Sequence, residues 1–213
     1  MKTILIVATL DTKGAEVSFA REQIEALGAK AMLLDAGVLN PPTVTPCITR
    51  EEVADAACSS IEEIRNIGSE GAALDVMAVG GGNIALKLYQ EGKIDGVLSI
   101  GGSCGTSLGT GVMRALPIGV PKFMISSQAA NPAVVSATVK TSDICMFHSV
   151  SDVAGLNRLT KTIFVRACGG VVGMAKAEIP HEKGEQRTVG FCTKGTTEAA
   201  NVMIRQKIFD ARY

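Results

Sequence analysis

The stretch that decides the fold is LSIGGSCGTSLGTG, Leu98–Gly111, in which five glycines fall within fourteen residues. It follows the apolar run DGVLSI and precedes an apolar stretch that ends at ALPIG. Glycines between a strand and a helix let the backbone approach a ligand, and the N–H groups that open the helix favour an anion. We therefore expect a phosphate-binding loop formed by Gly101, Gly102, Ser103, Gly105 and Thr106.

The same glycines also fit a second interpretation, tight packing of the helix against the strand. The spacing is neither that of a P-loop, because no Gly-Lys-Ser/Thr follows, nor G-x-G-x-x-G. Gly109 and Gly111 lie further into the expected helix, where close packing against the sheet or a dimer mate explains them better.

Strand-like and helix-like segments alternate on both sides of this stretch. Apolar, β-branched runs predict buried strands in TILIVAT, AKAMLLDAG, PKFMISS and SDICMFHSV. Apolar residues at helical spacing predict helices over residues 11–28, 49–68 (capped by Thr49) and 151–175. The fold predicted is α/β, Rossmann- or flavodoxin-like, with a mostly parallel sheet and helices on both faces.

The segment EGAALDVMAVGGGNIALKLYQEG, residues 70–92, allows two structures. It reads either as a strand with a glycine turn or as one long helix. Three consecutive glycines inside a helix cost about 1 kcal/mol each relative to alanine. The local pattern leaves open whether Gly80–Gly82 form helix or loop.

Ligands of such sheets bind beyond the carboxyl ends of the strands, which places four loops on one rim. These loops are Thr9–Glu16, Asp35–Leu39, Gly101–Thr106 and Ser126–Asn131. After the first strand, Lys13 suits a phosphate, and Asp11 suits a ribose hydroxyl or a water-bound magnesium ion. A cap of the following helix by Asp11 or Thr12 is the alternative. Candidate ligand-binding residues on the rim outside the glycine loop are Thr9, Asp11, Thr12, Lys13, Gly14, Asp35, Ser126 and Ser127.

Other polar residues allow simpler interpretations. Asp35 ends the second strand and suits ribose hydroxyls, although a solvated strand-end acid explains it equally well. Lys122 and His148 are expected to be structural. Asp143 is expected at the entry of a strand, and Ser151 or Asp152 as the cap of the long helix.

The six cysteines are scattered singly without a C-x-x-C pair, and the two histidines are not paired, so no metal site is predicted. We expect most of the cysteines to be buried. Cys104 at a helix N-terminus could have a lowered thiol pKa and act as a nucleophile, but no base is identifiable beside it.

Composition restricts the class of protein. Hydrophobic residues make up 46% of the 213-residue chain, 21 basic residues balance 21 acidic ones, and aromatic residues make up 4%. A neutral chain with few aromatic side chains is not expected to bind nucleic acid, because it lacks both a positive field and stacking surfaces. Apolar runs are too short for a membrane span, so a cytoplasmic protein without membrane contact is expected.

Three motifs in order, ATLDTKGAE, GKIDGVLSIGGSCGTSLGTGVMRALPIGVPKFMISS and SDICMFHSVSDVAGLNRLTKTIFVRACGGVVGMA, resemble a family of bacterial and plant proteins. That family is named for a plant tomato mosaic virus resistance protein and described as its ATP-binding domain. The resemblance implies a Rossmann-like domain that binds ATP, with or without Mg²⁺, followed by a second α/β domain and often forming a dimer. It places every rim and glycine-loop candidate except Asp35 at the nucleotide site. This chain departs from the family pattern at Cys104, where members have glycine, and in the loop SSQAANP.

The expected organisation is a nucleotide-binding domain over residues 1–177, a charged linker over 178–187 and the truncated start of a second domain over 188–213. Members of the family are about twice as long, so a fragment, a split gene or a natural short form all fit. The expected partner is a second copy or a separate second-domain chain. Besides ATP binding, two functions fit: an enzyme acting on a small phosphorylated or acyl substrate, and a nucleotide-gated interaction module without catalysis. The sequence does not decide whether the protein is an enzyme.

Overall fold

The computed structural model describes residues 1–179, 189–191, 193 and 195–211. Residues Met1–Ala177 form one compact unit, built on a five-stranded sheet whose strand order is β2-β1-β3-β4-β5. Every neighbouring pair of strands is parallel, which confirms the predicted α/β fold. The strands are β1 (Thr3–Ala8), β2 (Lys30–Asp35), β3 (Gly96–Gly101), β4 (Lys122–Ser126) and β5 (Cys145–His148).

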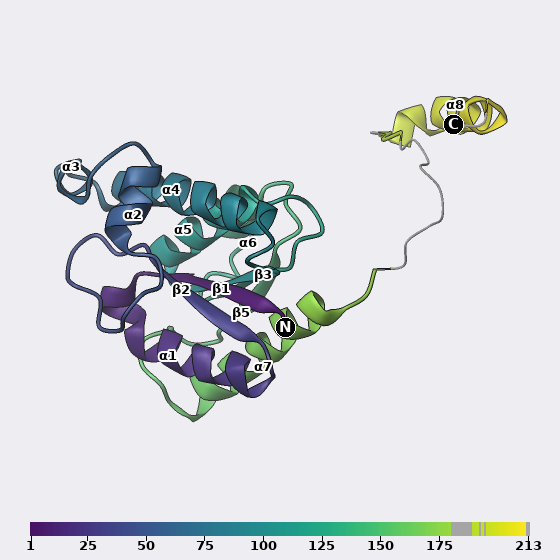
Figure 1. Cartoon of the computed structure of the whole chain (residues 1–213). Helices are drawn as coiled ribbons and strands as arrows, with labels where there is room; N and C mark the ends of the chain where they lie inside the picture. Colours follow the sequence, from purple (N-terminus) through teal and green to yellow (C-terminus); the bar gives the residue numbers. More distant parts are fainter. Residues whose placement is uncertain (180–188, 192, 194, 212–213) are drawn as a thin grey trace. The chain divides into compact units, whose positions relative to one another are not determined.

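Helices cover both faces of the sheet (Figure 1). One hydrophobic cluster joins one sheet face to α2, α4 and α5, and a second joins the other face to α1 and α7. The central strands are buried from both sides, which explains the continuous apolar run of β1. The helices of this unit are α1 (Leu10–Ala26), α2 (Arg50–Ala56), α3 (Ile61–Arg65), α4 (Glu70–Gln90), α5 (Ser103–Arg114), α6 (Pro132–Val139) and α7 (Arg158–Lys176).

The triple glycine lies inside α4, so one helix, Glu70–Gln90, takes up nearly all of the segment that allowed two structures. A Cβ on Gly80 would lie 1.9 Å from the Val53 carbonyl oxygen of α2. On Gly81 it would lie 2.9 Å from the Val112 side chain of α5, and on Gly82 3.0 Å from the Ala115 side chain. The glycines therefore let two neighbouring helices pack directly on the α4 backbone.

Two helix predictions need correction. The predicted helix over residues 49–68 is two helices, because Cys58 has a positive φ of 57° and Ser60 starts α3 with a capping box to Glu63. The long helix α7 starts at Arg158 and is capped by the Asn157 side chain, not by Ser151 or Asp152. Thr49 caps α2 as predicted, and the caps of α3 and α7 come from Ser60 and Asn157, which were not expected as caps.

Lys122 is structural, as predicted: its side chain is 0% exposed and its ammonium lies 2.7 Å from Asp143 Oδ1. It also donates to the carbonyls of Pro117 and Val120. Asp143 accepts from the Gly119 N–H as well, so it joins the loop before β4 to the segment before β5.

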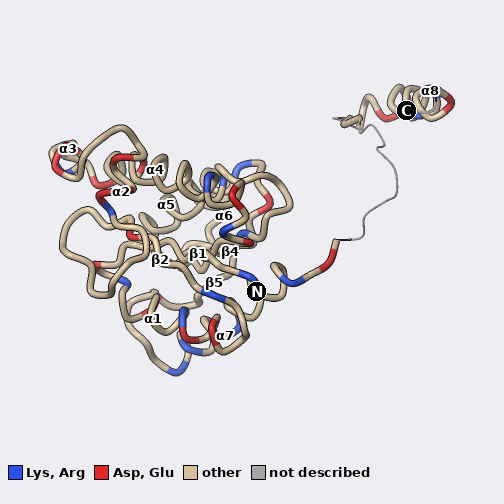
Figure 2. The backbone as a smooth tube through the Cα atoms, viewed as in Figure 1, with Lys and Arg blue, Asp and Glu red and all other residues tan. Residues whose placement is uncertain are grey.

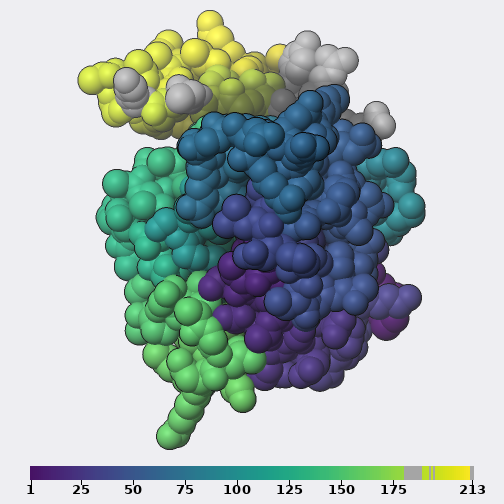
Figure 3. Space-filling view, turned by 90° about the vertical axis from the view of Figure 1, so that its left-hand side faces the viewer, coloured from purple at the N-terminus to yellow at the C-terminus, as the bar shows by residue number. Residues whose placement is uncertain are grey.

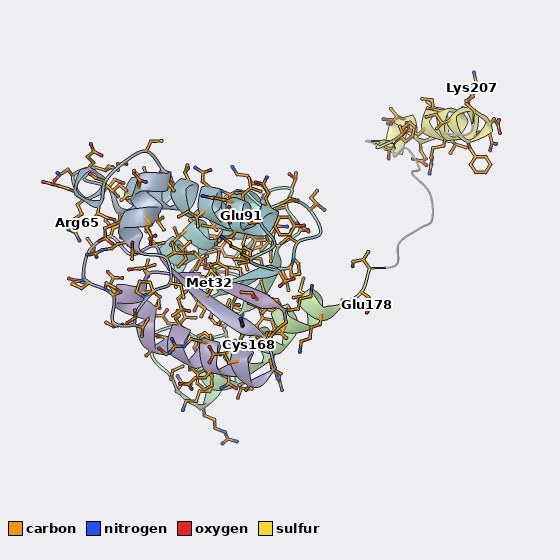
Figure 4. All side chains as sticks on the ribbon, in the orientation of Figure 1. Met32, Arg65, Glu91, Cys168, Glu178 and Lys207 are labelled. Carbon is orange, nitrogen blue, oxygen red and sulfur yellow. The ribbon has the colours of Figure 1, made fainter. Side chains whose placement is uncertain are left out.

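The expectation that most of the cysteines are buried was wrong for the described residues: Cys47, Cys58 and Cys104 are exposed and Cys145 is half-buried. Cys168, labelled in Figure 4, is buried between α7 and α1, and burial raises the pKa of its thiol to about 12.

Residues Glu178–Tyr213 form a second, smaller unit. Its described part contains a 3₁₀ turn, η1 (Gly195–Thr197), and α8 (Glu198–Asp210), in agreement with the helix expected there. The expected linker, apart from residues 178 and 179, lies outside the described residues, as do residues 188, 192 and 194 of the strand-and-turn region expected before α8. Among the helices that the structure describes, none is long and apolar enough to cross a membrane.

Candidate functional site

A cavity of about 480 Å³ opens at the carboxyl edge of the sheet, between the segments that follow β1 and β3. The strand order reverses between β1 and β3, and ligands of open α/β sheets bind at such switch points. Figure 3 views this edge of the unit, where the segments after β1 and β2 lie beside each other. The lining residues are Thr9, Asp11, Thr12, Lys13, Val38, Leu39, Ile64, Arg65, Gly68, Ser69, Glu70, Ala73, Leu74, Ile100, Gly101, Gly102, Ser103, Cys104 and Gly105.

The first turn of α5 supplies one wall of this cavity. Gly102 is the N-cap residue and no side chain caps the helix. The first intrahelical bond of this turn is donated by the Thr106 N–H to the Gly102 carbonyl, at 2.8 Å. The N–H groups before Thr106 have no acceptor within the helix, so their partial positive charge faces the cavity.

Gly101 is required by this turn. A Cβ on Gly101 would lie 2.5 Å from the Cα of Gly105, because the helix turns back directly over the end of β3. Gly109 packs against Ser99 of the sheet, as predicted, whereas Gly111 packs against Ala78 of α4 and not against the sheet. The glycine stretch therefore combines an open helix N-terminus with close helix packing.

Lys13 lines the cavity from a kink in α1. Its backbone departs from helical geometry, with φ −120° and ψ 16°. Its ammonium donates to the Val153 carbonyl at 2.8 Å, and Glu16 accepts from the Gly155 N–H at 2.6 Å. These two bonds fix the β5–α7 segment against α1, and the ammonium retains further N–H donors for a ligand.

Asp11 links the first rim loop to the loop after β2. Its Oδ2 accepts from the Asn40 N–H at 3.1 Å. Arg65 of α3, labelled in Figure 4, donates to the carbonyls of Val38 and Leu39. The Asp11 and Arg65 side chains thus bond to backbone groups of the loop after β2. The apolar side chains of that loop, Val38 and Leu39, form part of the cavity wall.

Asp35 is buried, so the interpretation as a solvated strand-end acid was wrong. It is 1% exposed, and its Oδ1 accepts from the N–H groups of Leu10 and Gly37. Asp35 therefore binds the first N–H of α1, and neither Asp11 nor Thr12 occupies the N-cap position, which is Thr9. Burial raises the pKa of this carboxyl, and the charge of Asp11 adds to that effect.

The expectation of a lowered pKa for Cys104 was wrong. Partial burial and a hydrogen bond to the Glu70 carboxylate raise the pKa of the thiol above its ordinary value. Glu70 opens α4, so the thiol and the carboxylate connect two helix N-termini across the cavity. The protonated thiol is a hydrogen-bond donor at this site, which argues against a nucleophilic role.

The structure brings eight predicted residues together in the cavity lining and places five elsewhere. Gly14 packs under Thr43, Asp35 is buried behind the rim, and Ser127 is not part of the lining. Thr106 and Ser126 hydrogen-bond to each other at 2.6 Å beneath the first turn of α5.

Sequence reasoning missed the wall formed by Ile64–Leu74, because residues 49–68 were expected to be one continuous helix. The signals for this wall were present as two capping sequences, at Ser60 with Glu63 and at Ser69.

Comparison with known proteins gives the chain a family. The model of an uncharacterised protein family, the UPF0261 N-terminal domain, matches residues 2–180. The chain belongs to this family. A UPF0261 protein of Clostridium tetani is 38% identical over 202 residues, covering 94% of this chain and 50% of that protein. A UPF0261 protein of Brucella suis is 32% identical, covering 91% of this chain and 46% of that protein.

A plant relative matches over a shorter region. The ToMV susceptible protein tm-1(GCR26) of Solanum lycopersicum is 36% identical over 111 residues, which is 52% of this chain and 14% of that protein. These matches support the expected family and its plant branch, whereas the ATP binding that the resemblance implied is a proposal. The UPF0261 chain spans about half the length of its bacterial relatives.

Proposed function

We propose that this UPF0261 chain binds a phosphate-bearing nucleotide, ATP in the first place, in the cavity between the segments that follow β1 and β3. The main support is the uncapped N-terminus of α5, whose N–H groups face the cavity beside Lys13. This arrangement attracts anions through oriented backbone dipoles and one side-chain cation. Both signs of charge are present over this unit, and acidic residues gather around α2 and α3 (Figure 2), so the attraction for an anion comes from the groups that line the cavity.

The remaining lining suits the other parts of a nucleotide. Val38, Leu39, Ile64, Ala73 and Leu74 give an apolar wall for a base. The hydroxyls of Thr9 and Thr12 lie on the rim between, where they can bind ribose hydroxyls. A few polar groups beside apolar lining are typical of small-molecule sites.

The test is a thermal-shift series on the full chain with ATP, ADP, adenosine, NAD and sugar phosphates. We expect the largest rise in melting temperature with ATP and almost none with adenosine. Lys13→Met should reduce the ATP shift, whereas Lys87→Met, which removes an exposed lysine outside the cavity, should not. The proposal fails if ATP gives no shift at saturating concentration, or if a sugar phosphate gives a larger one.

A further inference from the structure

Two carboxylates meet behind the cavity without enough hydrogen-bond donors. Asp11 follows β1 and lines the cavity, while Asp35 ends the neighbouring strand β2. Asp11 Oδ1 and Asp35 Oδ2 are buried, and neither has a hydrogen-bond partner in the described part of the chain. An acceptor that is buried and unpaired is costly, so a native structure that keeps two of them calls for an explanation.

Gly37 keeps the space between these carboxylates open. A Cβ on this residue would lie 3.0 Å from Asp11 Oδ1 and 3.0 Å from Asp35 Oδ1. The backbone of Gly37 does not have a positive φ, so conformation alone does not require glycine here. What its missing side chain provides is room beside two carboxylate oxygens.

The cations near this point already have partners in the protein. Burial is the main cause of the raised pKa of Asp35, the charge of Asp11 adds to it, and Arg50 opposes it. Lys13 and Arg65, which line the cavity, donate to the carbonyls of Val153 and of Val38 and Leu39. The Arg50 guanidinium is already bonded to the Glu51 carboxylate and to the Asn40 carbonyl. A phosphate group bound at α5 would bring more negative charge to the same cavity.

A divalent cation resolves this conflict. Mg²⁺ takes oxygen ligands and is commonly held by one or two carboxylates together with phosphate oxygens of the substrate. Such a site is incomplete until the phosphate binds. In the described part of the chain, no group of three or more His, Cys, Asp or Glu residues could hold a metal by itself.

We propose that the nucleotide binds together with a divalent cation, that Asp11 Oδ1 is the protein ligand of this cation, and that Asp35 supports it from behind. The inference rests on the proposed nucleotide site and adds the cation and the residues that select it. Asp11 Oδ2 keeps its bond to the Asn40 N–H, so the carboxylate is oriented before the cation arrives. Gly37 leaves the Asp11 carboxylate uncrowded on one side, and the cation with its water ligands lies on the other side, in the cavity that Asp11 lines.

The experiment is isothermal titration of the full chain with ATP, once with excess Mg²⁺ and once with EDTA. For the wild-type chain we expect at least about tenfold tighter binding with Mg²⁺. Asp11→Asn should bring the two affinities close together, because an amide oxygen binds Mg²⁺ poorly yet still accepts from Asn40. Gly37→Ala should weaken the Mg²⁺ effect as well, because its Cβ would crowd Asp11 Oδ1 without changing the charge.

Asp75→Asn is the matched control, since it removes an exposed carboxylate of α4 outside the cavity and should keep the wild-type ratio. Equal ATP affinity with Mg²⁺ and EDTA in the wild-type chain would overturn the cation inference and leave the nucleotide site standing. A Mg²⁺ effect that survives in Asp11→Asn would also overturn it, because the cation would then be held by the phosphates alone. Absence of ATP binding under both conditions would overturn the nucleotide site itself.

Discussion

At the scale of single residues, carboxyl groups hold several segments of the backbone and one buried cation in place. Asp35 binds two N–H groups at the end of β2, and Asp11 fixes the neighbouring loop. Asp143 neutralises the buried Lys122 on the opposite edge of the sheet. Each of these roles depends on a buried side chain and its particular partners. The sequence predicted a structural role for Lys122 but did not predict that Asp35 is buried.

Asp35→Asn tests the cost of the buried carboxyl in the absence of ligand. Because burial raises the folded-state pKa of Asp35 above its ordinary value of 3.8, ionisation destabilises the folded chain. The substitution should therefore raise the free energy of unfolding at pH 7 by about 1 kcal/mol. The gain should disappear as the pH falls below 3.8, where Asp35 is protonated in both states. Urea unfolding at both pH values measures it, and a larger gain at the lower pH would contradict the assignment.

Asp143→Ala tests the ion pair on the opposite edge. It leaves the fully buried Lys122 ammonium with carbonyl partners only, so we expect a loss of about 2–3 kcal/mol in the free energy of unfolding. Lys122→Met combined with Asp143→Ala should recover part of that loss, because no unpaired charge then remains. Chemical denaturation of the single and double variants decides this, and an additive double variant would count against the pairing.

At the scale of elements, glycines let helices pack closely rather than giving the chain freedom. The α4 glycines contact α2 and α5, and Gly101 contacts the first turn of α5. The sequence predicted the glycine turn after β3 because a strand and a helix flank it. The sequence did not decide whether residues 80–82 are helical. Three glycines inside a helix are stabilised by packing against α2 and α5, and a local sequence pattern carries no information on that packing.

A pair of alanine substitutions separates these roles. Gly80→Ala places a Cβ 1.9 Å from the Val53 carbonyl oxygen and should cost about 3 kcal/mol or more in unfolding free energy. Gly173→Ala in α7 meets no atom within 4 Å and should instead stabilise the chain by about 0.5–1 kcal/mol. Thermal melts of both variants test the contrast. Equal effects of the two substitutions would mean that helix propensity alone governs these positions.

At the scale of the whole molecule, the sequence was sufficient for the parallel α/β fold and for two of the cavity walls. Those two walls directly follow β1 and β3, and ligands of parallel α/β sheets bind beyond the carboxyl ends of the strands, so their position could be predicted. The third wall, residues 64–74, comes from a chain reversal at Cys58–Ser60 that the helical pattern concealed. The loop after β2 was placed on the rim, yet its fixation by Arg65 required the tertiary structure.

Both hydrophobic clusters lie within Met1–Ala177, so this unit should hold the cooperative stability of the chain. A chain that ends after residue 179 is expected to unfold in urea within about 0.5 kcal/mol of the full chain. Far-UV circular dichroism of the two chains checks this. A clearly lower midpoint for the shorter chain would show that residues 180–213 stabilise the sheet unit.

The central claim is that the open N-terminus of α5 binds phosphate. Calorimetric titration of ATP into the wild-type chain and into Gly101→Ala tests it most directly, with circular dichroism to verify that the variant is folded. A Cβ at Gly101 displaces the Gly105 backbone, so we predict one ATP bound per wild-type chain and at least about tenfold weaker binding by the variant. Unchanged ATP affinity in folded Gly101→Ala, or no binding by the wild-type chain, would contradict the account.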